Sequence, residues 1–125
     1  MRPSPLTSLD PNKRVLLVED DPDTLALMRV LLTRLSILAV PAANCADAWR
    51  AAEALGGLDL VITDESLPDG RGSQLADGLA RRYGCEVIVV SGLPPGPLLP
   101  RGVRHWLTKP VDFTRLREAV ATLVA

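Results

Sequence analysis

The chain has 125 residues, a length that fills one domain and allows a sizeable core. Its 14 basic and 15 acidic residues leave a net charge of −1, which excludes the strongly basic surface that direct binding of nucleic acid requires. No apolar run is long enough to span a membrane, and the N-terminus lacks the apolar segment of a signal peptide.

Residues 1–12 predict a disordered tail, because they carry two early prolines and no such apolar segment, and residues 13–125 predict one folded domain. The two cysteines, Cys45 and Cys85, lack the spacing of metal ligands, which favours free thiols in a reducing compartment. We therefore expect a soluble, cytoplasmic protein that does not contact a membrane.

The first predicted strand, residues 14–18, is a short apolar run of the kind that is buried on both faces of a sheet. A helix follows, with Asp21 as its N-cap and Pro22 at its first position. One face of this helix is apolar and carries Leu25, Met28, Leu32 and Leu35. Residues 37–43 predict a weaker strand, which Pro41 places at a sheet edge because proline donates no ladder hydrogen bond.

The same alternation of strands and helices continues to the end of the chain. In order, the pattern predicts a helix over 44–55, a strand over 58–63, a helix over 73–83, strands over 85–90 and 103–108, and a closing helix over 112–124. Asn44 and Asp112 are the expected N-caps, and Gly56 with Gly57 should end the helix that Asn44 begins.

Strands that alternate with helices predict an α/β fold with a doubly wound parallel sheet and right-handed connections. In such sheets, functional groups collect at the carboxyl ends of the strands. The polar residues at or just after the predicted strand ends are Glu19, Asp20, Asp64, Ser91 and Lys109. Three acids, a hydroxyl and an amine are therefore expected to converge on one edge of the sheet.

Four segments at these strand ends, VLLVEDDPDT, DLVITDESLPDG, VIVVSG and WLTKPVD, resemble the receiver domain of bacterial two-component response regulators. The resemblance covers nearly all of residues 13–125. It implies a flavodoxin-like sheet of five parallel strands in the order 2-1-3-4-5, in which the first and third strands are neighbours about 4.8 Å apart. Asp20 and Asp64 would then face one cation.

The resemblance implies a Mg²⁺ site, which would explain the run of acids after the first strand. Glu19, Asp20 and Asp64 would supply carboxylates, and Ser66 would supply its backbone carbonyl. Mg²⁺ prefers oxygen ligands in octahedral geometry and keeps several waters. An isolated group of acids before a helix is more commonly a cap or a solvated turn, and Asp21 is expected to have that simpler role.

In the chemistry that the resemblance implies, Asp64 is the phosphoacceptor, whose carboxylate attacks a phosphoryl group carried by a phosphohistidine to give an acyl phosphate. Lys109 would offset charge on that group, and the family commonly holds the bond from this lysine to Pro110 in cis. Ser91 would donate its hydroxyl to a phosphoryl oxygen. Trp106 stands where the family usually carries a tyrosine or phenylalanine that swings inward as a switch, and both rotation and a fixed, partly buried ring remain open.

The main departure from the family lies between Ser91 and Lys109, which are 109 − 91 = 18 positions apart, a few fewer than is typical. Four prolines fall within residues 94–100, and each proline in a helix interior costs about 3 kcal/mol. Residues 92–102 therefore predict a Pro-rich loop or a single 3₁₀ turn in place of the fourth helix, as in receivers of hybrid histidine kinases. Because that helix contributes to dimer surfaces in many members, we expect a monomer.

The implied function is a single-domain receiver that accepts a phosphoryl group from a histidine kinase or a histidine phosphotransfer protein. It would signal to a downstream protein through contacts, with no enzymatic activity beyond its own phosphorylation and dephosphorylation. Leu93, two residues beyond Ser91, offers no group to orient a hydrolytic water, so slow self-dephosphorylation is expected unless Ser66 holds that water instead.

Three alternatives use the same fold. A Mg²⁺-dependent phosphohydrolase with an aspartyl-phosphate intermediate would place a second acid two residues after the nucleophile, where this chain has Ser66. A nucleotide- or flavin-binding module would need a Gly-rich loop after the first strand, where this chain has EDDPDT. A purely structural pseudo-receiver would not need the intact set of acids, hydroxyl and amine. Turnover of small phosphate esters, flavin absorbance and Mg²⁺ affinity would distinguish these alternatives.

Overall fold

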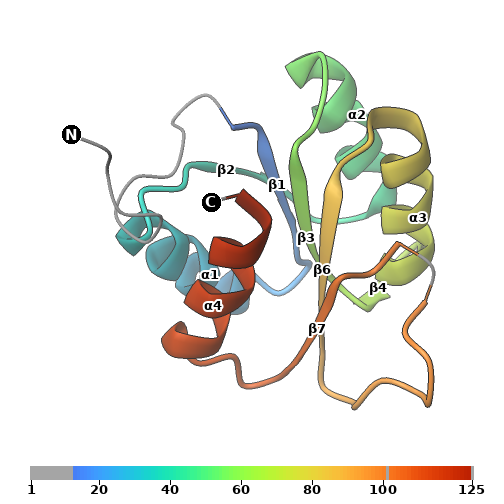
Figure 1. Cartoon of the computed structure of the whole chain (residues 1–125). Coiled ribbons are helices and arrows are strands. Elements are labelled where there is room, and N and C mark those ends of the chain that lie inside the picture. Colours follow the sequence, from blue (N-terminus) through green and yellow to red (C-terminus); the bar gives the residue numbers. More distant parts are fainter. Residues whose placement is uncertain (1–12, 101, 125) are drawn as a thin grey trace.

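The computed structural model describes residues 13–100 and 102–124, so the predicted tail over 1–12 lies outside the described residues. Five parallel strands form one sheet in the order β2-β1-β3-β6-β7, with helices on both faces (Figure 1). The strands of this sheet are β1 (Val15–Val18), β2 (Ala39–Ala42), β3 (Leu60–Asp64), β6 (Glu86–Ser91) and β7 (His105–Thr108). The helices are α1 (Pro22–Arg34), α2 (Cys45–Leu55), α3 (Gly72–Tyr83) and α4 (Phe113–Val124). This is the predicted doubly wound order, with β6 and β7 as the fourth and fifth strands of the sheet.

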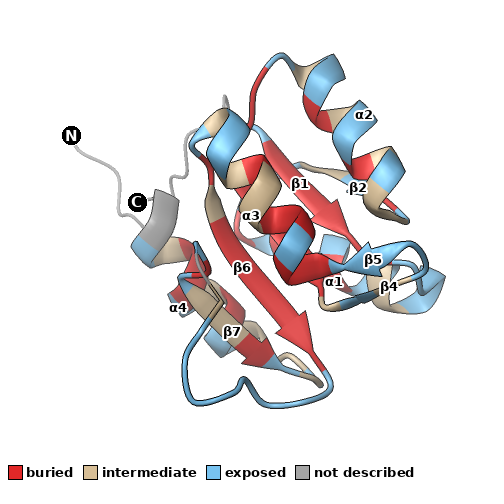
Figure 2. Ribbon diagram, turned by 90° about the vertical axis from the view of Figure 1, so that its right-hand side faces the viewer, coloured by how far each residue is buried: buried red, intermediate tan, exposed pale blue. Residues whose placement is uncertain are grey.

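The central strands are apolar on both faces because a pair of helices packs against each face. On one face, α1 and α4 enclose a cluster that includes Leu32 and Leu116. On the other face, α2 and α3 enclose a second cluster that includes Ala48 and Leu79. Burial extends along β1 and nearly all of β6 (Figure 2), which explains why the sequence shows continuous apolar runs rather than an alternating pattern.

The helix boundaries follow the capping residues that the sequence predicted. Asp21, Asn44 and Asp112 each accept a hydrogen bond from the backbone N–H three residues later, at 3.0, 2.7 and 2.8 Å. Gly56 ends α2 with a φ of 73°, a left-handed conformation that glycine adopts without steric cost. Pro41 lies in β2, which is an edge strand as predicted. Among the helices of the described chain, none combines the length and apolarity needed to cross a membrane.

The sequence predicted the conformation of one loop at the carboxyl edge of the sheet but not that of a second loop. Residues 92–102, called the proline loop below, contain no helix in their described part (92–100 and 102), as predicted. Between β3 and α3, where the sequence predicted no strand, the chain forms a small hairpin of β4 (Ser66–Leu67) and β5 (Gly70–Arg71). The turn residues between these strands reverse the chain, and the two short segments then pair antiparallel.

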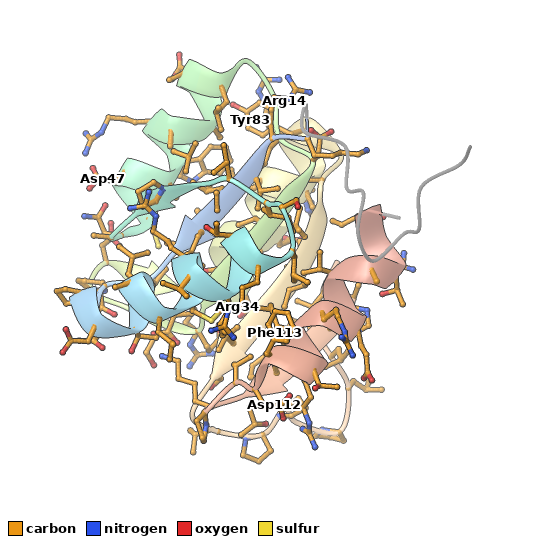
Figure 3. All side chains as sticks on the ribbon, turned by 90° about the vertical axis from the view of Figure 1, so that its left-hand side faces the viewer. Arg14, Arg34, Asp47, Tyr83, Asp112 and Phe113 are labelled. Carbon is orange, nitrogen blue, oxygen red and sulfur yellow. The ribbon has the colours of Figure 1, made fainter. Side chains whose placement is uncertain are left out.

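Aromatic side chains fix the packing between helices on each side of the sheet. Trp49 of α2 lies against α3, where a Cβ added at Gly78 would come within 2.9 Å of its ring, and its ring centroid is 6.5 Å from that of Tyr83. On the other side, the guanidinium of Arg34 in α1 lies 5.8 Å from the ring centroid of Phe113 in α4 (Figure 3). Gly78, which by propensity weakens a helix, therefore allows α3 to approach α2 closely.

Candidate functional site

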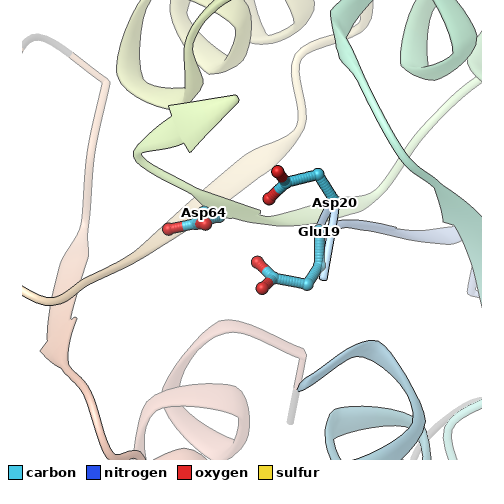
Figure 4. Close-up of side chains that lie close together, drawn as sticks. All are labelled: Glu19, Asp20 and Asp64. Atoms are coloured by element: carbon cyan, nitrogen blue, oxygen red, sulfur yellow. The ribbon is translucent and has the colours of Figure 1, made fainter. Parts of the chain in front are cut away.

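Three carboxylates meet at the carboxyl edge of the sheet. Glu19 and Asp20 follow β1 directly, and Asp64 ends the neighbouring strand β3 (Figure 4). The register pairs Val18 with Thr63, which brings the acids after them side by side, and one carboxylate oxygen from each of the three lies within 4.8 Å of the others. Glu19 and Asp64 are buried, with 3% and 8% of their surface exposed, whereas Asp20 is exposed.

Burial of these acids has an electrostatic consequence. Desolvation, together with a hydrogen bond to Asp64 and the charge of Asp64, raises the pKa of Glu19 from 4.5 to about 7, although Lys109 acts in the opposite direction. Clustered carboxylates repel one another unless a proton or a cation offsets their charge. The donor set, three carboxylates with at least one oxygen each within reach of a common point, suits a hard dication that binds oxygen.

Lys109 follows β7 and reaches into the same cluster. Its Nζ lies 3.2 Å from Asp64 Oδ2 and 3.3 Å from Glu19 Oε1. Burial lowers the pKa of this amine, but the charges of Asp64 and Glu19 outweigh that effect and raise the pKa above its ordinary value. The Lys109–Pro110 peptide bond is cis, as the resemblance implied. The amine is therefore held as a cation against both buried acids.

Ser91 ends β6, the strand on the other side of β3 from β1. It is buried, with 6% of its surface exposed, and its carbonyl accepts a 2.7 Å hydrogen bond from the backbone N–H of Lys109. Its Oγ accepts a hydrogen bond of 3.1 Å from the backbone N–H of Leu93. Trp106 in β7 is partly buried against the α2–α3 side of the sheet, and its Nε1 donates to the carbonyl of Leu93 at 2.9 Å. The predicted hydroxyl and amine thus stand at the same edge as the acids.

Ser66 is exposed and begins β4, two residues after Asp64. The role of its carbonyl as a metal ligand stays a prediction. The predicted metal and catalytic side chains, Glu19, Asp20, Asp64, Ser91 and Lys109, all come from strand ends at this edge, whereas Ser66 and Trp106 lie beside it, in the hairpin and in β7.

Three residues that sequence reasoning missed hold the segment after Asp64, residues 65–72, which is called the acceptor loop below. Glu65 accepts hydrogen bonds from the backbone N–H of Ser73 at 2.7 Å and from its Oγ at 3.0 Å. A Cβ added at Gly72 would lie 1.8 Å from the carbonyl oxygen of Asp64, so only glycine permits this approach. The sequence shows this glycine, but it does not show that the carbonyl oxygen of Asp64 packs against it.

Asp69 at the hairpin turn is the third missed residue. Its carboxylate accepts hydrogen bonds from the first backbone N–H groups of α2, those of Cys45 at 2.7 Å and Ala46 at 3.0 Å. These bonds lower the pKa of Asp69. The partners lie 24 and 23 residues earlier in the chain, so no local pattern predicts the contact. Cys45 and Cys85 are free thiols, as predicted.

The arrangement is suited to receiving an electrophile that carries negative charge. The carboxylate of Asp64 lies beside the Lys109 amine and two further acids, and Ser91 ends the neighbouring strand β6. Such a set can hold a cation and offset the charge of a phosphoryl group placed near Asp64.

Comparison with known proteins places this geometry in a family. Residues 15–121 match the family described as the response regulator receiver domain. The response regulator protein PilR of Pseudomonas aeruginosa is 36% identical over 115 residues, which cover 88% of this chain and 26% of PilR. The two-component response regulator ARR11 of Arabidopsis thaliana is 29% identical over 109 residues, which cover 83% of this chain and 21% of ARR11. The chain therefore spans about a quarter or less of the length of these relatives.

Solved structures give the same result. The receiver domain of the hybrid histidine kinase CckA is 29% identical, with a TM-score of 0.76 over 90% of this chain and 99% of that one. The response regulator TrrA of Thermotoga maritima, solved in complex with Mg²⁺ and BeF, is 24% identical and shares the fold, with a TM-score of 0.80 over 89% of this chain and 98% of that one. The chain therefore belongs to the receiver domain family of two-component response regulators.

Proposed function

We propose that Asp64 accepts a phosphoryl group from a phosphohistidine of a histidine kinase or a histidine phosphotransfer protein. The observation that carries this proposal is the placement of the Lys109 amine 3.2 Å from the buried Asp64 carboxylate, beside two further acids. A buried carboxylate with a cation beside it can act as a nucleophile toward a charged group, because the cation offsets the negative charge of the incoming group.

Mg²⁺ fits the acids at this edge. Glu19, Asp20 and Asp64 would hold it, together with the backbone carbonyl of Ser66. Two of these carboxylates are buried, and the pKa of Glu19 is raised to about 7, so a bound dication would relieve their repulsion. When bound, Mg²⁺ supplies positive charge that helps to neutralise the oxygens of a transferring phosphoryl group.

In the proposed transfer, a carboxylate oxygen of Asp64 forms a bond to phosphorus while the bond from phosphorus to the histidine nitrogen breaks. The electron pair of the broken bond stays on the histidine, and the product is an acyl phosphate. Lys109 offsets charge on the phosphoryl oxygens as a compact ammonium, and the Ser91 hydroxyl donates a hydrogen bond to one of them. Hydrolysis of the acyl phosphate restores Asp64.

The proposal is tested with a small phosphodonor such as acetyl phosphate in the presence of Mg²⁺. We expect one base-labile phosphoryl group per chain, detected by mass spectrometry, and none in Asp64→Asn, which has the shape of aspartate but lacks its nucleophilic oxygen. Asp77→Asn is a matched control, because Asp77 lies on α3 and pairs there with Arg81. Undiminished phosphorylation of Asp64→Asn would show that the acceptor lies elsewhere.

The metal site is tested separately by titrating Mg²⁺ into the unphosphorylated protein. Asp20→Ala should weaken Mg²⁺ binding, since Asp20 is proposed as a direct ligand. Asp23→Ala, which removes another exposed acid from the first turn of α1, should leave the affinity unchanged. Equal Mg²⁺ affinity in wild type and Asp20→Ala would count against the role of Asp20.

We further propose that the protein acts in the cytoplasm as a monomer that signals through protein contacts. The lack of a helix in the described part of the proline loop supports the monomer, because family members commonly use that helix in dimers. Light scattering with and without beryllofluoride, a phosphoryl mimic, tests it. A stable dimer on addition of beryllofluoride would contradict it, and steady turnover of small phosphate esters would instead favour a phosphohydrolase.

A further inference from the structure

The backbone of Leu93 connects two side chains that stand on different strands. Its N–H donates to Ser91 Oγ at 3.1 Å, and its carbonyl accepts from Trp106 Nε1 at 2.9 Å. Ser91 ends β6 and Trp106 lies in β7, so the start of the proline loop is held between the two strands. These two hydrogen bonds form a continuous chain from the indole of Trp106 to the hydroxyl of Ser91.

The position of Leu93 depends on these two bonds. Its side chain is 73% exposed and contributes little packing that could hold the backbone in place. Proline has no N–H, and four of the residues that follow Leu93 up to position 100 are prolines. No other hydrogen bond joins residues 92–99 to the rest of the described chain. The Trp106 indole therefore supplies one of only two such attachments for this segment.

The bond from Leu93 also decides where the Ser91 hydroxyl points. A serine hydroxyl has one proton and two lone pairs. When one lone pair accepts the Leu93 N–H, the rotamer of Ser91 is set and its proton remains available for donation. The Ser91 backbone is already fixed by the pairing of β6 with β7 and by the N–H of Lys109, which donates to its carbonyl at 2.7 Å. The hydroxyl orientation is thus the remaining degree of freedom, and Leu93 fixes it.

We propose that Trp106 is a positioning residue that orients the Ser91 hydroxyl through the backbone of Leu93. The role of that hydroxyl in transfer rests on the proposed function above. The indole acts through its N–H while its ring stays packed against the α2–α3 side of the sheet. A phenylalanine ring has no hydrogen-bond donor, and a tyrosine ring carries its donor only at the para hydroxyl, so in this chain the bond to Leu93 comes from the indole N–H of tryptophan.

Amide hydrogen exchange of the unphosphorylated, metal-free protein tests the link without any phosphoryl transfer. Trp106→Phe keeps an aromatic ring but removes the donor, and we expect the Leu93 amide to exchange about 3- to 10-fold faster, the size expected for one lost hydrogen bond. Trp49→Phe is the matched control, because Trp49 packs on α3 far along the chain from Leu93, and it should leave that amide unchanged. Unchanged exchange at Leu93 in Trp106→Phe would overturn the proposal.

If Trp106→Phe does not fold, two substitutions at Ser91 still test the proposal by amide hydrogen exchange. Ser91→Ala should speed exchange of the Leu93 amide to a similar extent, whereas Ser91→Thr, which keeps the hydroxyl, should preserve its protection. An equally protected Leu93 amide in Ser91→Ala would show that the hydroxyl does not accept this bond and would overturn the proposal.

A double-mutant cycle distinguishes positioning from a merely structural effect. Trp106→Phe should slow phosphorylation by acetyl phosphate with Mg²⁺ about 3- to 10-fold in the wild-type background and have no further effect in Ser91→Ala. Equal slowing in both backgrounds would show that Trp106 does not act through Ser91 and would overturn the proposal. If the wild-type protein accepts no phosphoryl group, the proposed function is wrong. The amide hydrogen-exchange experiment still decides whether Trp106 orients Ser91.

Discussion

The two loops that follow β3 and β6 stand next to each other at the same edge of the sheet, yet they are held in different ways. In the acceptor loop, Glu65 binds the start of α3, Asp69 binds the start of α2, and Gly72 touches the backbone of Asp64. In the proline loop, residues 92–99 make only the two hydrogen bonds at Leu93 to the rest of the described chain, and the side chains of Leu93 and Leu98 are exposed.

The difference indicates that one loop of the site is held rigidly while the other can change its conformation. The acceptor loop is fixed at several points, so Asp64 keeps its position whatever happens nearby. Residues 92–99 of the proline loop are hydrogen-bonded to the rest of the described chain only at Leu93, close to Ser91, so a change at Ser91 can alter this segment without disturbing the sheet. We therefore expect the local free energy of opening to be high in the acceptor loop and low in the proline loop.

The largest contrast should come from adding one methyl group to each loop. Gly72→Ala should lower the free energy of unfolding by about 3 kcal/mol, because the new Cβ would lie 1.8 Å from the backbone oxygen of Asp64, which cannot move aside. Gly96→Ala in the proline loop has nothing within 4 Å of its added Cβ and should change stability by less than about 1 kcal/mol. Urea unfolding measures both, and equal effects would remove the contrast.

The acidic cluster beside these loops should make the free energy of unfolding depend on pH when no divalent cation is present. Because the pKa of Glu19 is raised from 4.5 to about 7, the folded protein binds a proton that the unfolded chain releases between these values, and stability falls as pH rises through that window. Glu19→Gln cannot ionise, so in EDTA at pH 8 it should be more stable than wild type by about 1–2 kcal/mol.

The control for this prediction is the same pair of proteins near pH 4, below both pKa values, where Glu19 is mostly protonated in the folded and the unfolded state and the two proteins should be nearly equally stable. Adding Mg²⁺ at pH 8 should restore stability to wild type and much less to Glu19→Gln. Parallel pH profiles for the two proteins in EDTA would contradict the raised pKa.

A smaller effect is expected from releasing the hairpin of the acceptor loop. Asp69→Ala removes the acceptor for two N–H groups of α2, so Tm should fall at pH 7, and the Cys45 and Ala46 amides should exchange faster. The pKa of Asp69 is lowered from 3.8, so its stabilising effect is present above that value and is lost as pH falls through the lowered pKa. The Tm difference should therefore disappear in strong acid.

Glu53→Ala is the matched control for Asp69, because it removes an exposed acid from the same helix, α2, without removing an N-terminal acceptor. Its Tm should stay close to that of wild type at pH 7. A Tm loss in Glu53→Ala as large as that in Asp69→Ala would mean that net charge, rather than the hairpin contact, stabilises α2.

The smallest expected effect concerns the lifetime of the phosphorylated form. Leu93 places an apolar side chain two residues beyond Ser91, so Leu93→Asn should speed hydrolysis of the acyl phosphate by up to about tenfold, the scale of one hydrogen bond to water. Leu98→Asn, at another exposed leucine of the proline loop, should not change it. Decay is followed by mass spectrometry after the phosphodonor is removed. An unchanged or slower decay in Leu93→Asn would leave Ser66 as the residue that holds the water.

The order of the elements, the doubly wound sheet and the set of strand-end residues could all be predicted, because each rests on short-range patterns. Apolar runs gave the buried strands, Asp21, Asn44 and Asp112 marked helix starts, and prolines excluded a helix in the proline loop. The hairpin of β4 and β5 was missed because strands of two residues carry no periodic signal. It is defined by pairing and by the contact of Asp69 with a helix more than twenty residues away.

By itself, the sequence determined which residues stand at the edge of the sheet, since a parallel sheet brings all carboxyl ends of its strands to one side. Only the tertiary structure decided how they interact. The depth of burial that raises the pKa of Glu19, the contact of Gly72 with Asp64, and the hydrogen bond from Trp106 to Leu93 all depend on how the strands and loops pack together. Residue types and their spacing fix local conformation, but desolvation and contact energies arise only when the strands are packed together.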